Sequence, residues 1–527
     1  MPTQTSSFRS VRSAMTAAAA TLSLGILLGS SITYYDEALP SSMNPLFART
    51  MVDQRSQELV FDRLYYRSAV TNRLLSRLVE RDSEVGEDAL KVVVREGVRW
   101  HDGKRLGPED VCFTVDAMLN PNTPSTVAQG YREVLAGCEV EKKDNAATIR
   151  FVRPFYNKKE RLQFRLLPKH AFRSTAIRPD DSFSSTPIGS GPMKAERSSR
   201  AVTMERVDNL HYQTRIDRMA MSQGGDPQVQ VRNVLLGAVQ GVVAVTPPLR
   251  QDIGASEDAS LKSYDLRSWW FIAINPKTVS DRRIRQALNH FLDREQLREL
   301  TIGVKPGAVN PPCQFISGPF VPSSPYYNHA IEEVVHADYT KAKGLMKAVG
   351  AKWVDGRWRL RGRPIPLRIG INASLAPEAP DLLAQVGNQL REAGFETSVY
   401  SESADTWVRD AVTGQLTGKY DMLIGKWSFG LVEEVDDLFH SRTGAEGSSN
   451  IFNYKNPQAD ALIAQFGAAR TDTEAQDAYH ALHALLAEDL PYLFLWKLDT
   501  KSAWRNEVRD NIIAPYFYFS EFDDWRM

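Results

Sequence analysis

Residues 268–292 read SWWFIAINPKTVSDRRIRQALNHFL, and this stretch decides the fold. Its first part is aromatic and β-branched, which favours a buried strand over residues 269–274. The Asn-Pro pair that follows ends the strand, because proline has no backbone donor and restricts its predecessor. Ser280 or Asp281 then caps a helix whose apolar side chains recur at helical spacing. The residue types favour core packing for the two tryptophans, and a ligand wall beside a hinge is the alternative.

Length and composition indicate a large globular protein. The chain has 527 residues, more than one ordinary domain holds, so we expect two or three lobes. Hydrophobic residues make up 43% and charged residues 24%, as is typical of globular chains. Lys+Arg and Asp+Glu number 64 each, which argues against a nucleic-acid binder that works through a basic surface. The balanced charge is compatible with a small or zwitterionic ligand.

Residues 1–31 have the pattern of a secretory signal peptide. Arg9 and Arg12 supply the positive start, and residues 14–28 form an apolar stretch too short for a comfortable membrane span. Small residues follow at 29–31, and no cysteine stands there for lipid attachment. We expect export to a periplasm, with an uncleaved N-terminal anchor as the alternative.

The chain has three cysteines. Export implies an oxidising compartment, in which Cys112 and Cys138 could form a disulfide and leave Cys313 over. Three buried free thiols are an equally open interpretation. No Cys/His spacing indicates a zinc site.

Strand and helix patterns alternate along the rest of the chain. Apolar residues at helical spacing predict a helix within residues 57–66. Pro108 is suited to the first turn of another helix, with acidic residues after it. An Asp-Gly turn predicts a hairpin over residues 353–358. The β-α-β order from 367 to 400 implies a sheet covered by helices.

Four motifs in this order resemble the family 5 extracellular solute-binding proteins of ABC importers, which include oligopeptide-, dipeptide- and nickel-binding proteins. They are VREGVRWHDGK at 94–104, PIGSGP at 187–192, DRRIRQALN at 281–289 and DYTKA at 338–342. The second motif alone is also compatible with a phosphate-binding loop, but no helix pattern or Lys-Ser/Thr pair follows it, so a tight structural turn is favoured.

The resemblance implies an α/β, two-lobed periplasmic binding protein-like fold with an extra subdomain. Two hinge strands, 268–275 and 492–496, would join the lobes. The implied division is residues 32–70, 185–267 and 497–527 for lobe I, 71–184 for its inserted subdomain, and 268–496 for lobe II.

Family members capture a peptide between the lobes, and the resemblance extends this to a peptide or peptide-like solute here. It implies no catalytic residue, cofactor or metal, and it implies a permease pair with ATPase subunits as partners. The membrane would be reached only through the permease or an uncleaved N-terminal segment. Aromatic residues that match pocket positions are Trp270, Phe271, Trp427, Phe429 and Trp496.

One departure from the family pattern concerns the ligand's amino end. Peptide-binding members place an aspartate three residues after the equivalent of Trp427, where it pairs with the peptide α-ammonium. This chain has Gly430 there. Glu433 or Glu434 could substitute, although a solvated acidic loop is the favoured interpretation.

Other functions were weighed against this one. The same fold could bind a nickel chelate, haem or an oligosaccharide. His480 and His483, three residues apart on a predicted helix, could hold a metal with a carboxylate, but surface pairs of this kind are common. A secreted hydrolase is the weakest alternative, because the sequence has no G-x-S-x-G or H-E-x-x-H motif.

Overall fold

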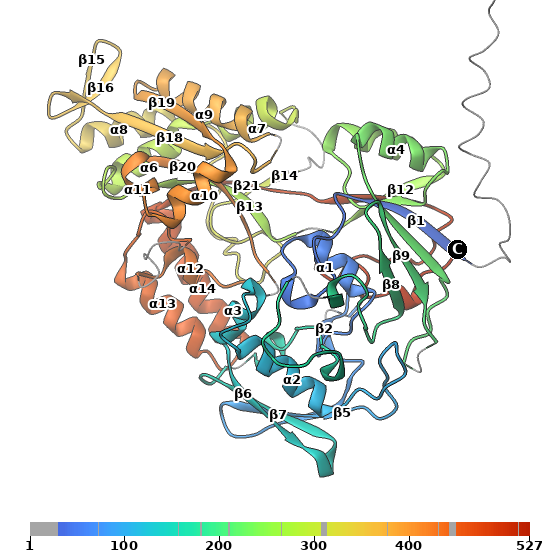
Figure 1. The fold of residues 1–527 in the computed structure, drawn as a ribbon. Helices are drawn as coiled ribbons and strands as arrows, with labels where there is room; N and C mark the ends of the chain where they lie inside the picture. Colours follow the sequence, from blue (N-terminus) through green and yellow to red (C-terminus); the bar gives the residue numbers. More distant parts are fainter. Residues whose placement is uncertain are drawn as a thin grey trace, which may run out of the picture.

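A computed structural model describes residues 30–527, except 72, 156, 180–181, 209–210, 265, 307–312, 377, 431, 442–448 and 515. The predicted signal peptide lies outside these residues apart from its last two. Three larger sheets organise the described chain, and Figure 1 shows them as separate parts of the molecule. None of the helices in the described part is both long and apolar enough to cross a membrane.

The first sheet has seven strands in the order β12-β22-β11-β1-β10-β9-β8. Strand β1 lies parallel to β10 and β11, and the remaining pairs are antiparallel. The strands are β1 (Ser31–Asp36), β8 (Met193–Arg197), β9 (Ala201–Arg206), β10 (Arg218–Gln223), β11 (Gly241–Val242), β12 (Ala259–Ser263) and β22 (Lys501–Arg505). Helices α1 (Met51–Glu58), α4 (Pro227–Leu235) and α5 (Arg250–Gly254) lie between them in the chain. Strands from both ends of the chain therefore complete one sheet.

The second sheet has six strands in the order β14-β21-β13-β20-β18-β19. It consists of β13 (Ser268–Ile274), β14 (Cys313–Phe315), β18 (Pro366–Asn372), β19 (Glu396–Glu402), β20 (Met422–Ser428) and β21 (Tyr492–Leu498). Trp270, Ile272 and Ile274 enter one core cluster, and Trp269 and Phe271 enter another. Successive side chains of a strand point to opposite faces, so β13 is buried on both faces, as its uninterrupted apolar sequence predicts.

Helices cover both faces of the second sheet (Figure 1). They are α6 (Arg282–Phe291), α7 (Arg294–Ile302), α8 (Tyr339–Ala348), α9 (Ala379–Glu392), α10 (Ala404–Val412), α11 (Leu416–Lys419), α12 (Asp436–Phe439), α13 (Pro457–Ala468) and α14 (Asp472–Asp489). The carboxylates of Asp281 and Asp293 accept from backbone N–H groups at the starts of α6 and α7, as the sequence predicts. The predicted hairpin forms between β15 (Lys352–Val354) and β16 (Arg357–Leu360).

The third sheet lies at the bottom of Figure 1 and is packed against helices α2 (Pro108–Leu119) and α3 (Thr126–Arg132). Its order is β4-β5-β7-β6, with β4 (Val79–Glu84), β5 (Ala89–Val94), β6 (Leu135–Glu141) and β7 (Ala146–Phe151). Pro108 opens α2 as predicted, and Asp110 accepts from the N–H of Gly107. A disulfide joins Cys112 of α2 to Cys138 of β6, and Cys313 is a buried free thiol.

Along the described residues, the chain passes between the first and second sheets twice. It leaves β12 at Ser263 and enters β13 at Ser268, and it returns from β21 at Leu498 to β22 at Lys501. The backbone N–H of Tyr264 donates to the carbonyl of Thr500 at 3.0 Å, so the two crossings are bonded to each other. Two adjacent short segments therefore make the covalent connection between these sheets.

The helix predicted within residues 57–66 is wrong. Helix α1 ends at Glu58, Leu59 and Val60 form a turn, and the chain then pairs with another segment near Arg63. The N–H of Leu64 donates to the carbonyl of Phe164, and Arg63 forms an isolated antiparallel bridge with Arg165. Leu59, Val60 and Leu64 are completely buried. Because the segment is buried on several sides, the spacing of its apolar residues does not indicate a helix.

The PIGSGP loop packs against that extended segment. A Cβ atom on Gly189 would lie 1.8 Å from the carbonyl oxygen of Val60, so a side chain does not fit there. The N–H of Gly191 donates to the same oxygen at 2.9 Å. The glycines thus serve a close backbone contact, in agreement with the predicted structural turn.

The disulfide predicts a thiol count. Protein unfolded without reductant should react with Ellman's reagent at one thiol per chain, Cys313, and at three after reduction. Replacing both Cys112 and Cys138 by alanine should lower the free energy of unfolding by about 3 kcal/mol, because a cross-link over this separation restricts the unfolded chain. The control variant Cys313→Ala should show no thiol before reduction. Three reactive thiols in unreduced wild type would contradict the disulfide.

Candidate functional site

The end of β20 brings several predicted ligand-contacting residues next to the chain crossings. Trp427 pairs with Trp269 of β13, and the residues after it leave the sheet. The N–H of Phe429 donates to the carbonyl of Arg267 at 3.0 Å, immediately before β13 begins. Phe429 is buried, Trp427 is half-buried and Gly430 is exposed. The segment after β20 is therefore fixed against one of the two crossings.

The other predicted aromatic residues lie inside the core of the second sheet. Trp270 and Trp496 are completely buried in the cluster on one face. Phe271 lies on the opposite face, stacked on Tyr492 with ring centroids 4.5 Å apart. Core packing accounts for these three side chains, as the residue types favoured, and their contact with a ligand stays a prediction.

A cavity of about 120 Å³ lies beside Gly430, between α1, α2, α3 and the loop that follows β20. A Cβ atom on Gly430 would meet no heavy atom within 4 Å, so the absent side chain leaves open space. Apart from Gly430, the walls are Pro45, Leu46, Ala48, Gln54, Arg63, Met118, Val127, Tyr131, Phe164 and Arg165. The cavity is thus mostly apolar, with two guanidinium groups as its cations.

Arg63 and Arg165 were not predicted as site residues from the sequence. Their side chains are brought together by the bridge between the two extended segments, and they are only 8% and 6% exposed. Burial lowers the pKa of both, and the charge of Arg63 lowers the pKa of Arg165 further. The sequence did contain one indication that these arginines are buried: each stands within a largely apolar run, FDRLYY for Arg63 and QFRLLP for Arg165.

Glu433 contradicts the predicted solvated acidic loop, because it is 2% exposed. Its Oε1 lies 3.0 Å from Nη1 of Arg267, the residue that precedes β13. Burial raises the pKa of Glu433, and the Arg267 charge opposes this in part. Glu433 already has a cationic partner at the crossing, so its pairing with a ligand's ammonium group stays a prediction.

A larger hollow of about 830 Å³ lies between the third sheet and the helices α12 and α13. Two contacts span this region: Arg161 Nη2 lies 2.6 Å from Oε1 of Glu434, and Nη1 of Arg153 donates to the carbonyl of Gly467 at 2.9 Å. Acidic, basic and apolar side chains all line it, among them Glu434. One ion pair and one hydrogen bond therefore connect the segments that follow the third sheet to the region of α12 and α13.

The histidine pair on α14 has structural partners. The ring of His483 is completely buried, and its two nitrogens bond to the hydroxyl of Ser317 and the N–H of Asn328, each at 3.0 Å. His480 contacts the carbonyl of Pro325. Within the ranges that the structure describes, no group of three or more His, Cys, Asp or Glu side chains is arranged to hold a metal ion.

The sequence matches the family of bacterial extracellular solute-binding proteins, family 5, over residues 74–450. The chain belongs to this family. The first and second sheets, with the helices around them and the two chain crossings between them, accordingly form a two-lobed binding-protein fold.

Similar proteins share this fold at low sequence identity. The oligopeptide-binding protein AppA of Bacillus subtilis is 25% identical over 87% of this chain and 84% of its own length. The structure of AppA in complex with a nonapeptide superposes on this chain with a TM-score of 0.74. The superposition covers 95% of this chain and 99% of AppA, and the sequence identity is 21%. For the ABC transporter substrate-binding protein CtaP of Listeria monocytogenes the TM-score is 0.80, with 95% of this chain and 99% of CtaP covered at 19% sequence identity. For a periplasmic EDTA-binding protein, EppA, the TM-score is 0.79, with 95% of this chain and 96% of EppA covered at 17% sequence identity.

Glu433 gives a pH prediction. Because the folded-state pKa is raised, the folded protein favours the protonated carboxyl, and this stability is lost as pH rises from about 4.3 through the folded-state pKa. Glu433→Gln cannot ionise. Relative to the variant, wild type should therefore lose free energy of unfolding between pH 4 and pH 7.5, measured by urea denaturation.

Glu434→Gln is the matched control, because Glu434 is about one-third exposed and pairs with Arg161. A constant difference between wild type and Glu433→Gln across the same pH range would show that Glu433 is not buried as described.

Proposed function

We propose that this protein captures a peptide or peptide-like solute between its two lobes and delivers it to the permease of an ABC importer. Binding occurs in the periplasm after export through the N-terminal signal peptide. The protein makes and breaks no bond; closure of the lobes around the solute supplies the selectivity. The permease pair and its ATPase subunits are the partners in this proposal.

The observation that carries the proposal is the cavity at Gly430, whose walls come from segments on both sides of the chain crossings and which lies beside one of them. Motion at the two crossings would change the separation of these walls, so a solute there is sensed by both lobes. Family membership and a relative named as an oligopeptide-binding protein support a peptide. Trp427 and Phe429, next to the same crossing, are suited to contact its side chains.

A non-peptide solute on the same fold is the second candidate. Gly430 supplies no carboxylate for a peptide's α-ammonium, and the cavity's charged side chains are arginines. A structural neighbour named as an EDTA-binding protein supports this alternative.

The proposal predicts a co-purified small molecule. The mature protein is purified from its native host and unfolded, and the released molecules are identified by mass spectrometry. Short peptides should be released, and returning them to refolded protein should raise the thermal midpoint. By mass action, a ligand at one hundred times its Kd stabilises the fold by about 2.7 kcal/mol.

A single non-peptide compound would reject the peptide assignment and keep the importer function. If no solute is released and none of a peptide, polycarboxylate, metal-chelate and oligosaccharide panel raises the midpoint, the binding function itself is contradicted. Trp427→Ala should weaken peptide binding, and Trp353→Ala, which removes an exposed tryptophan from the distant β15 hairpin, is its control.

A further inference from the structure

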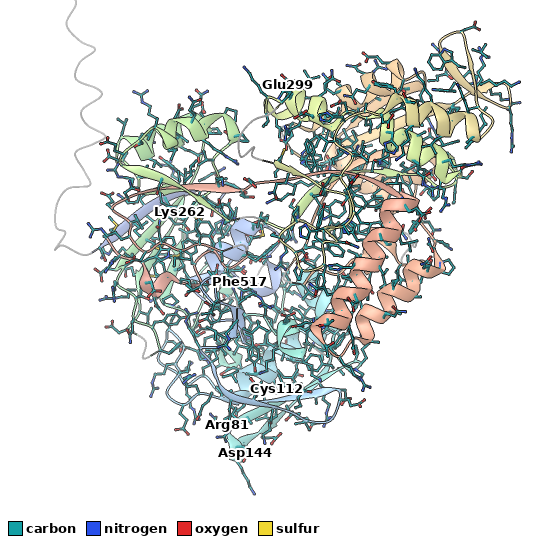
Figure 2. All side chains as sticks on the ribbon, turned by 180° about the vertical axis from the view of Figure 1, so that it is seen from behind. Arg81, Cys112, Asp144, Lys262, Glu299 and Phe517 are labelled. Atoms are coloured by element: carbon teal, nitrogen blue, oxygen red, sulfur yellow. A yellow bond between two sulfur atoms is a disulfide. The ribbon has the colours of Figure 1, made fainter. Side chains whose placement is uncertain are left out.

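A basic hollow lies beside the third sheet, at the start of α2. Its volume is about 1020 Å³, and its walls come mainly from residues within the segments 104–113, 142–145 and 169–175. Figure 2 labels Cys112 and Asp144, which are next to lining residues in the chain, at the lower end of the molecule, away from Glu299 of α7. The described residues that line this hollow and those that line the Gly430 cavity do not overlap, so the two are separate.

Basic side chains outnumber acidic ones around the hollow. Over the whole chain, Lys+Arg and Asp+Glu number 64 each. The described lining has three acids and six exposed lysines and arginines, which are Lys104, Arg105, Lys142, Lys143, Lys169 and Arg173. A chain without net charge thus gathers positive charge at one place, where it attracts anions.

The acids near the hollow neutralise few of these cations. Asp110 is 6% exposed, and its carboxylate already accepts from two backbone N–H groups, at 3.0 and 2.8 Å. Asp102, outside the lining, pairs with Lys104 at 3.4 Å. The other two acids of the lining, Glu96 and Glu109, form no ion pair within the described residues. Five of the six cations are therefore left without an acidic partner.

Lys142 and Lys143 have acidic neighbours in the chain, but these acids are paired elsewhere. The carboxylates of Glu141 and Asp144 lie 2.5 and 2.7 Å from Nζ of Lys91, which is on β5. In the part of the chain that the structure describes, Lys142 and Lys143 form no ion pair of their own. Two adjacent charges therefore stand at the rim of the hollow without compensation.

The segment after the third sheet adds two more cations to the rim. It is packed onto α2 through Phe172, whose ring stacks on that of Phe113 with the centroids 5.7 Å apart. Burial raises the pKa of Asp116 on α2, and the charge of Lys169 opposes this in part, but the two side chains form no ion pair. Arg173 likewise has no ion-pair partner among the described residues.

A disulfide and a hydrogen bond hold the walls in place. The Cys112–Cys138 bond joins α2 to β6, and β6 leads directly into the turn that carries the two adjacent lysines. Nη2 of Arg105 donates to Oδ1 of Asn145 at 2.9 Å, which joins the segment before α2 to the same turn. The backbone that carries the cations is thus ordered before a ligand arrives, and this lowers the cost of binding.

We propose that the basic hollow binds the phosphate groups of an anionic ligand, at a site separate from the solute cavity. A lysine ammonium group is a compact point charge, so several of them can approach the oxygens of one tetrahedral phosphate from different sides. Bound phosphate also relieves the repulsion between the unpaired cations. At about 1020 Å³, the hollow has room for more than one phosphate group. A free oligophosphate and a phospholipid headgroup share this chemistry, and the test distinguishes them.

The test measures binding of both kinds of phosphate to the mature protein. Pyrophosphate is titrated by calorimetry, with citrate as a carboxylate of similar charge. Vesicles of phosphatidylglycerol and phosphatidylcholine in equal parts are compared with phosphatidylcholine vesicles by co-sedimentation. Wild type should bind pyrophosphate at least about tenfold more tightly than citrate if the ligand is free, and should bind the phosphatidylglycerol vesicles alone if it is a headgroup. Added salt should weaken either interaction, because the cations are exposed.

Glutamine variants locate the binding. The combined variant Lys142→Gln, Lys143→Gln, Lys169→Gln and Arg173→Gln should weaken it at least about tenfold, because four exposed charges that each contribute modestly are lost together. The control variant loses as many charges from exposed positions on α8 and β15 and should bind as wild type does; its changes are Lys341→Gln, Lys343→Gln, Lys347→Gln and Lys352→Gln. If the first variant does not fold, its 142/143 and 169/173 pairs are replaced separately, and each should weaken binding about threefold.

Four outcomes would overturn the phosphate site. Wild type could bind neither pyrophosphate nor the phosphatidylglycerol vesicles, or bind citrate as tightly as pyrophosphate without binding vesicles. Equal weakening in the control variant would show that only the net charge matters. Unchanged binding in the variants of the hollow would place the phosphate elsewhere. None of these results affects solute capture, which is tested by the released molecules.

Discussion

The structure depends on two short crossings between two buried sheets. Strands β13 and β21 pair inside the second sheet, while the strands continuous with them, β12 and β22, pair inside the first. The two strand pairs make a nearly continuous ribbon through both lobes, and the Tyr264–Thr500 hydrogen bond holds the ribbon together between them. Because β13 is buried on both faces, we expect any movement of one sheet relative to the other to take place at the crossings.

The loop that follows β20 is attached to this ribbon. Phe429 is bonded to the carbonyl of Arg267, and Glu433 is paired with the guanidinium of the same residue. The hydroxyl of Tyr516, from the C-terminal segment, accepts from the N–H of Arg267. One residue before β13 thus joins the loop that carries Gly430 to the far end of the chain. In the proposed function, a solute that contacts this loop would act directly on the crossing.

The charged side chains of the Gly430 cavity are both cations. Arg63 and Arg165 lie in a largely apolar wall, and the acid that acts on both is the buried Glu58. Gly430 adds no carboxylate to this wall. The cavity therefore differs in charge from the family pattern, which places an aspartate at the position of Gly430.

The sequence was most informative where local chemistry decides structure. Residues close together in the sequence were enough to predict four features: strand β13, the start of α2 at Pro108, the aspartate caps of α6 and α7, and the Asp-Gly hairpin. The extended segment after α1 did not, because its apolar side chains are buried all round. The arginine pair could not be foreseen, since Arg63 and Arg165 become neighbours only when segments about one hundred residues apart are paired. Motifs located Trp427 and Gly430, but not the charged groups opposite them.

Small-angle X-ray scattering of the refolded protein, with and without its released solute, tests most directly whether the lobes close on a ligand at these crossings. The account predicts a smaller radius of gyration with the solute at saturation, together with a single, more compact form. Unchanged scattering at a solute concentration that calorimetry shows to be saturating would contradict capture by closure.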